Sequence, residues 1–282
     1  MNEAEYGIMS IDMIPRRSEA QCAYGCHDCE AERAFFCRDC EAHDKIIRRK
    51  TMDKKKQIVP PVMWVAVFFT ITLNNITYYG ARALTSERYH HDLTNGLDEK
   101  IPFLPWTVLI YFGCYLFWIV NYAIGCRQDK EKAFCFMGAD LIAKFVCLLC
   151  FLIFPTTNAR PDVEGQSFVH ELMRLLYQID AADNLFPSIH CLTSWLCVIA
   201  VRGNDKVPRW YRALSVLIAV SICISTLTTK QHVLVDVAAG VLLAEAAYLL
   251  CKKSGFSMWY AGAVSKLYER IAGKGGQCGE ES

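Results

Sequence analysis

The chain has 282 residues, of which 53% are hydrophobic and 21% charged, and its formal net charge is +1. The apolar residues gather in long runs between short charged segments, a distribution that excludes an ordinary soluble domain. A nucleic-acid partner is not expected, and the oligomeric state stays open.

The first 51 residues are polar and rich in cysteine. Cys26 and Cys29 form one C-x2-C pair and Cys37 and Cys40 form a second, which resembles the paired thiolate ligands of a zinc site. The gap between the pairs is shorter than in the common zinc patterns. We therefore expect residues 1–51 to form a cytoplasmic extension that is disordered or binds zinc, and that is dispensable for function. A disulfide framework is less favoured in a reducing compartment.

Six apolar runs follow this extension. A helix needs about 20 mostly apolar residues to cross the hydrocarbon core of a bilayer. The first two runs are secure on length alone, and the fourth, fifth and sixth, which are short or carry charges, are inferred to span from their place in the set. The predicted fold is an all-α integral membrane protein, a six-transmembrane helix bundle over residues 58–253. The six runs cover residues 58–81, 101–126, 133–155, 185–201, 213–229 and 232–251.

Lysine and arginine residues are concentrated beside one set of alternate connections. Examples are the segment 45–56 before the first run and the segment 202–212 between the fourth and fifth runs. Positive residues stay preferentially on the cytoplasmic side of a membrane. The pattern predicts a multi-pass protein of the cell membrane with both termini in the cytoplasm. The connections 82–100, 156–184 and 230–231 would then face outward.

Two further segments have the pattern of surface helices. Apolar residues recur at helical spacing between Gln166 and Ile179, which predicts an amphipathic helix at the outer surface. Residues 254–282 are expected to form an interfacial helix, which carries aromatic and basic side chains from Phe256 to Ile271, and then a disordered tail.

Ionisable residues collect at the predicted outer ends of the last three runs. His190 lies near the start of the fourth run, and His232 opens the sixth, with Asp236 four residues later. Residues four apart share one face of a helix, so Asp236 can accept a hydrogen bond from one ring nitrogen of His232. This contact leaves the other nitrogen basic, and a histidine held in this way can be a nucleophile toward phosphorus. His190 could then protonate the leaving oxygen as a general acid.

Three other residues near these histidines suit an anion. Arg160 and Lys230 carry positive charge, and Ser188 stands where a helix is expected to begin. Helix N-termini and guanidinium groups both bind phosphate well. Each residue alone has a simpler explanation, such as a helix cap, a structural hydrogen bond or a side chain that reaches the interface. Together, in an otherwise apolar chain, they predict a phosphate site.

The order of these residues resembles a known family. Pro187-Ser188-x-His190, followed by Ser225 and by His232-x3-Asp236, is similar to motifs two and three of the type 2 phosphatidic acid phosphatase superfamily. Arg160-Pro161 resembles the end of its first motif. The stretch from Ser225 to Asp236 is most similar to the branch that includes inositol phosphorylceramide synthases, and the resemblance covers roughly residues 58–253.

The resemblance implies a role for each residue. His232 would form a phosphohistidine that Asp236 orients, His190 would be the general acid, and Arg160 and Ser188 would bind phosphate. Two positions depart from the family pattern: Ile153 stands where the first motif has lysine, and Thr226 where the third motif has arginine. Lys230 could replace the missing charge.

Three functions fit these observations. The first is a membrane phosphatase that hydrolyses a lipid phosphate or diphosphate ester. The second is a phosphotransferase that passes the phospho group to a lipid or polyol hydroxyl, and the third is a non-catalytic membrane protein of the same fold. Neither catalytic alternative requires a cofactor or a metal, and both predict a lipid phosphate substrate at the outer face of the membrane.

Overall fold

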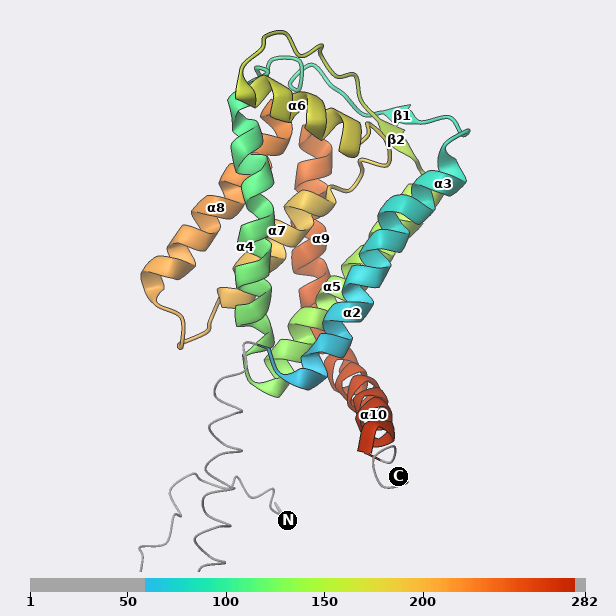
Figure 1. Cartoon of the computed structure of the whole chain (residues 1–282), viewed down its shortest axis with the longest axis vertical. Coiled ribbons are helices and arrows are strands. Elements are labelled where there is room, and N and C mark those ends of the chain that lie inside the picture. Colours follow the sequence, from blue (N-terminus) through green and yellow to red (C-terminus); the bar gives the residue numbers. More distant parts are fainter. Residues whose placement is uncertain (1–58, 277–282) are drawn as a thin grey trace, which may run out of the picture. The chain divides into compact units, whose positions relative to one another are not determined.

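The computed structural model describes residues 59–276, and within this range the chain is predominantly helical (Figure 1). The one sheet of the described range consists of two strands of two residues each, β1 (His91–Asp92) and β2 (Thr156–Thr157), which pair in parallel. The all-α prediction therefore holds apart from this short pairing of two loops. The cysteine pairs proposed for zinc lie outside the described residues.

Among the described residues, five helices are long and apolar enough to cross a membrane. The first is continuous from Pro61 to Thr85 and consists of α2 (Pro61–Asn75), the π-helical turn η1 (Ile76–Gly80) and α3 (Ala81–Thr85). The other four match the expected second, third, fifth and sixth runs to within a few residues. They are α4 (Val108–Cys126), α5 (Lys130–Ile153), α8 (Arg209–Thr228) and α9 (Leu234–Lys253). The 3-10 turn η2 (Pro105–Thr107) leads directly into α4.

The fourth apolar run does not form a helix of spanning length, so the prediction of six spans is not confirmed. The helix α7 (Ile189–Val201) has 13 residues, which at 1.5 Å per residue is about 20 Å, less than the roughly 30 Å of the hydrocarbon core. The run was overestimated because Leu185 to Pro187 are apolar but lie in the loop before the helix. Ser188 caps the helix instead, since its Oγ accepts the N–H of Cys191 at 3.3 Å.

The short helix α7 is the centre of the bundle. It packs against α4, α5, α8 and α9 (Figure 1), and ten of its 13 residues are buried. A helix that is apolar on all sides is stable when other helices surround it. Burial among these helices is therefore sufficient to explain why the residues of this run are apolar.

Gly240 allows α9 to approach the start of α7. A Cβ atom at this position would lie 2.5 Å from the carbonyl oxygen of Ser188. The backbones are also linked directly, because the N–H of Ser188 donates to the carbonyl of Asp236 at 3.1 Å. The absence of a side chain at Gly240 thus brings the start of α7 against the first turns of α9.

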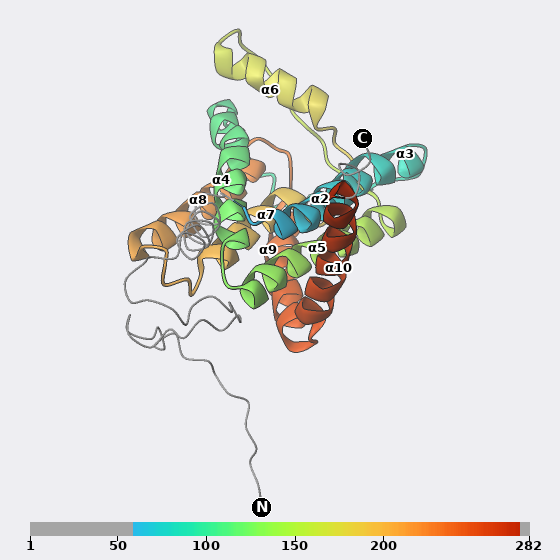
Figure 2. The same cartoon turned by 60° about the horizontal axis from the view of Figure 1, so that its bottom comes forward.

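Both predicted surface segments are helical. The helix α6 (Phe168–Ile179) lies across one end of α4, which it contacts (Figure 1). The helix α10 (Phe256–Gly276) lies against α5 and also contacts α2 and α9 (Figure 2). Exposed Phe168, Leu175 and Ile179 give α6 an apolar outer face, which suits a membrane surface.

Candidate active site

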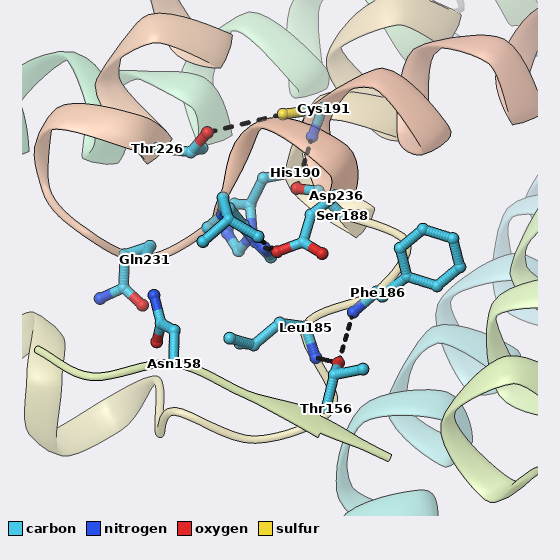
Figure 3. Close-up of polar contacts among 12 residues, drawn as sticks. Thr156, Asn158, Leu185, Phe186, Ser188, His190, Cys191, Thr226, Gln231 and Asp236 are labelled. Atoms are coloured by element: carbon cyan, nitrogen blue, oxygen red, sulfur yellow. Dashed lines mark hydrogen bonds and ion pairs between the residues drawn. The ribbon is translucent and has the colours of Figure 1, made fainter. Parts of the chain in front are cut away.

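Three loops meet at the end of the bundle where α7 and α9 begin. Thr156 fixes the loop before α7, because its Oγ1 accepts the N–H groups of Leu185 and Phe186 at 2.9 Å each (Figure 3). Asn158, from the same strand-containing loop, donates its Nδ2 to the carbonyl of Lys230 at 2.9 Å. The segments near residues 156–160, 180–188 and 229–233 are therefore held together.

His232 and Asp236 interact as the sequence predicted, although not on one face of a helix. The Nδ1 atom of His232 lies 3.3 Å from Oδ2 of Asp236. The helix α9 begins only at Leu234, so Asp236 reaches back from the first turn of α9 and also accepts the N–H of Val233 at 3.1 Å. The carboxylate thus caps the helix and orients His232 at the same time.

The Asp236 carboxylate also sets the proton affinity of His232. Burial by itself would lower the pKa of His232, but the hydrogen bond and the negative charge of Asp236 outweigh it, and the pKa is raised. Since Asp236 lies at Nδ1, the other ring nitrogen, Nε2, is left for a substrate.

His190 occupies the first turn of α7 and faces His232. The two ring centroids are 6.1 Å apart. Tyr111 and Trp118 of α4 flank the His190 ring, with centroid distances of 4.6 and 5.5 Å. The two imidazoles are therefore close enough for one phosphoryl group to contact both.

Asp180, directly after α6, receives hydrogen bonds from two phenols. The hydroxyl of Tyr111 donates to its Oδ2 at 2.5 Å and the hydroxyl of Tyr78, in the π-helical turn, donates to its Oδ1 at 2.6 Å. Burial would raise the pKa of Asp180, but the charge of nearby His190 and the two phenols outweigh burial, so its pKa is lowered. Asp180 is therefore an ionised carboxylate beside His190.

Arg160 lies in the same region and is fixed on several sides. Its Nη1 donates to the backbone carbonyl of Asp180 at 2.6 Å, its Nη2 donates to the side chain of Gln231, and its guanidinium lies 4.9 Å from the ring centre of Tyr177. Its Nε is buried and has no hydrogen-bond partner within residues 59–276. This Nε–H therefore lacks the partner that a buried donor normally has.

Lys230 and Ser188, which the sequence predicts as phosphate contacts, bind backbone groups in the structure. Two of the three hydrogens of the Lys230 ammonium serve the backbone carbonyls of Asp98 and Ile101, at 2.9 and 2.7 Å. The Ser188 hydroxyl caps α7. Both residues lie next to the histidines in the sequence, and their contact with phosphate stays a prediction.

Two cavities border His232. One, of about 280 Å³, is lined by His190, His232 and Asp180, by tyrosine, tryptophan and aliphatic side chains of η1, α4 and α6, and by the amides of Asn74, Asn75 and Asn184. The other, of about 690 Å³, is lined by polar groups that include Asn158 and Lys230. His232 lines both cavities, and both have mixed polar and apolar walls, so it borders open space on two sides. Within residues 59–276 no cluster of three or more His, Cys, Asp or Glu residues is suited to a metal ion.

Four residues of this site were missed in the sequence: Tyr78, Tyr111, Asp180 and Gln231. The tyrosines lie inside apolar runs, where they read as packing residues, and Asp180 lies in a loop with no motif around it. A signal was available only for Gln231, which directly precedes His232. The other three are brought to the site by tertiary packing.

Comparison with known proteins gave one match. The family model described as the PAP2 superfamily matches residues 88–250, which is more than half of the chain and includes Arg160, both histidines and Asp236. No curated protein and no solved structure matches.

Proposed function

This chain belongs to the PAP2 superfamily, and from this membership and the site geometry we propose that it is a membrane phosphatase that hydrolyses a lipid phosphate or diphosphate ester. The observation that carries the proposal is the arrangement of two histidines. His232 is held by Asp236 at Nδ1, and His190 lies opposite, with the ring centroids 6.1 Å apart.

In the proposed mechanism, His232 is the nucleophile. The lone pair on its Nε2 attacks phosphorus while the bond from phosphorus to the leaving oxygen breaks. His190 donates a proton to that oxygen, and the product is a phosphohistidine and a free alcohol. Water then attacks the phosphohistidine, His190 takes its proton, and phosphate leaves.

The negative charge of the transferring group needs donors in place before the reaction. We assign Arg160 to this role because its Nε is buried and unpartnered within the described range. Ser188 and Lys230 are assigned as further phosphate contacts, Ser188 at the N-terminus of α7 and Lys230 through the third hydrogen of its ammonium.

The cavity that contains both histidines favours an amphiphilic substrate. Its walls include Tyr115, Trp118, Leu176 and Ile179, and α4, which carries two of them, is long and apolar enough to span a membrane. An acyl or polyprenyl chain would be stabilised against such walls, while the phosphate lies between the histidines. The distribution of positive residues in the sequence supports an outward-facing site.

The test is a product screen with the purified full chain in detergent. Phosphatidate and a polyprenyl diphosphate are offered in micelles, with and without added alcohols, and free phosphate is measured. We expect phosphate release that vanadate inhibits. Transfer of the phospho group to an added alcohol in preference to water would identify a phosphotransferase instead. No turnover of any phosphate ester would overturn the enzymatic proposal.

A further inference from the structure

Within the described residues, the imidazole of His190 forms one hydrogen bond, and its partner is a phenol. Its Nδ1 lies 3.3 Å from the hydroxyl of Tyr111. That hydroxyl has a single hydrogen, and it is directed to Asp180, where the O–O distance is 2.5 Å. The Tyr111 oxygen is therefore left as an acceptor toward His190, which must carry a hydrogen on Nδ1. The Nε2 of His190 is consequently the nitrogen that exchanges a proton with substrate.

At the far end of this chain of hydrogen bonds, the Asp180 carboxylate forms no ion pair with a lysine or arginine side chain of the described residues. Within residues 59–276, both oxygens of the Asp180 carboxylate accept from phenols and neither accepts from lysine or arginine. Arg160 is held by the backbone carbonyl of Asp180, not by its side chain. A carboxylate in a largely apolar cavity favours a cation nearby, and His190 is a group next to it that can become one.

We propose that Tyr111 and Asp180 are positioning residues for the general acid, with Tyr111 fixing the tautomer of His190 and Asp180 stabilising its protonated form. The inference rests on the proposed function, because it concerns the proton that His190 gives to the leaving group. It assigns to His190 the kind of support that Asp236 provides to His232, with a phenol placed between carboxylate and imidazole.

His190 gives up one proton in the first step and regains one in the second. The imidazolium of His190 starts with hydrogens on Nδ1 and Nε2. When the bond from phosphorus to the leaving oxygen breaks, its electron pair stays on oxygen, and oxygen takes the Nε2 hydrogen. His190 becomes neutral with its Nδ1 hydrogen still directed at Tyr111. Water oxygen then bonds to phosphorus while the P–N bond to His232 breaks and its electron pair returns to Nε2 of His232. One proton of that water passes to Nε2 of His190, and phosphate leaves.

The leaving group provides a readout that a purely structural role would not change. An alkyl phosphate needs a proton on its leaving oxygen, whereas p-nitrophenyl phosphate releases a stabilised phenolate and needs little help. General acids contribute typically about a hundredfold to ten-thousandfold to such steps. The experiment measures kcat on both esters for the wild type, Tyr111→Phe, Asp180→Asn and the reference variant His190→Ala.

We expect Tyr111→Phe and Asp180→Asn to lose about tenfold to a hundredfold on the alkyl ester and much less on p-nitrophenyl phosphate, in the same direction as His190→Ala. The ratio of the two rates is independent of the fraction of folded protein. The matched control is Tyr211→Phe in the first turn of α8, which removes a phenolic hydrogen bond to Asn121 and none to Asp180 or His190, and should keep the wild-type ratio.

Three results would count against the proposal. If Tyr111→Phe and Asp180→Asn reduce both rates equally, the residues support the fold and not the acid. If Tyr211→Phe shifts the ratio as much as Tyr111→Phe does, the contact between Tyr111 and His190 has no specific role. If the wild type cleaves neither ester, the proposed function itself fails. A wild type that is active, with variants that keep its rate ratio, would refute only the roles of Tyr111 and Asp180.

Discussion

The imidazole rings of His190 and His232 lie with their centroids 6.1 Å apart and their planes inclined by 53°. They come from two different segments: His190 is in the first turn of α7, and His232 lies just before Val233, the N-cap residue of α9. Each is tied to a separate carboxylate, His232 directly and His190 through a phenol. The two histidines therefore have independent supports, and changes to each support are expected to have different effects.

The Asp236 carboxylate should govern the acid side of the pH–rate profile. Only neutral His232 has a free lone pair on Nε2, so the rate rises as the pH increases through the pKa of His232. Asp236 raises this pKa, so Asp236→Asn should move the acid limb to lower pH. The plateau should also fall by about a hundredfold or more, because the orienting acceptor is lost.

The pH–rate profile of kcat for this variant is compared with that of Glu245→Gln. Glu245 is a second carboxylate on α9, but it pairs with Arg202 and Trp195. Its neutralisation should leave the acid limb in place. An acid limb that stays fixed in Asp236→Asn would contradict the assignment of that limb to His232.

Arg160 should contribute to phosphate affinity through the shape of its guanidinium group. Arg160→Lys keeps the charge but loses the buried Nε donor and the contacts to Asp180 and Gln231. We expect vanadate to inhibit this variant about tenfold to a hundredfold more weakly, the range for hydrogen bonds to charged groups. Arg174→Lys, on the exposed face of α6, is the control; equal vanadate inhibition of the two variants would exclude Arg160 as a phosphate ligand.

Gly240 should be needed for the alignment of His190. An added Cβ would lie 2.5 Å from the carbonyl of Ser188, and Ser188 caps the helix that carries His190. Gly240→Ala should therefore destabilise the bundle by about 1–3 kcal/mol and reduce kcat. Unfolding in detergent and phosphate release provide the two measurements.

Gly113→Ala is a matched control for this substitution. Gly113 lies in α4, and nothing is within 4 Å of its added Cβ. The free energy of unfolding should rise by about 0.5–1 kcal/mol, because alanine favours the helix. If Gly240→Ala is as stable and as active as Gly113→Ala, the close approach of α9 to α7 has no functional role.

The sequence predicted most of the fold because apolar runs of spanning length leave few alternatives. The sixth span is not confirmed, because the apolar composition of α7 does not distinguish a helix buried among other helices from one that crosses a bilayer. Ten buried residues in a helix of 13 account for that composition. The start of α9 was also placed too early. His232 lies before the helix, and Asp236 contacts it while capping the first turn of α9.

The candidate site was predictable where its residues are close in sequence. His232 and Asp236 are four residues apart, and Ser188 and His190 are two apart. Tyr111 and Asp180, by contrast, are 69 residues apart, and neither belongs to a motif. Their hydrogen bond depends on how α6 ends beside α4, which is a tertiary relationship that composition and periodicity do not encode.

The central claim is that His232 carries the phospho group, and the most direct test is covalent labelling. The full chain is mixed with a radiolabelled lipid phosphate, quenched in base and digested. We predict an acid-labile, base-stable label on the peptide that contains His232. The label should also form in the control variant Glu245→Gln and should be absent from His232→Ala. A label on another residue, or phosphate release by His232→Ala at the wild-type rate, would contradict the account.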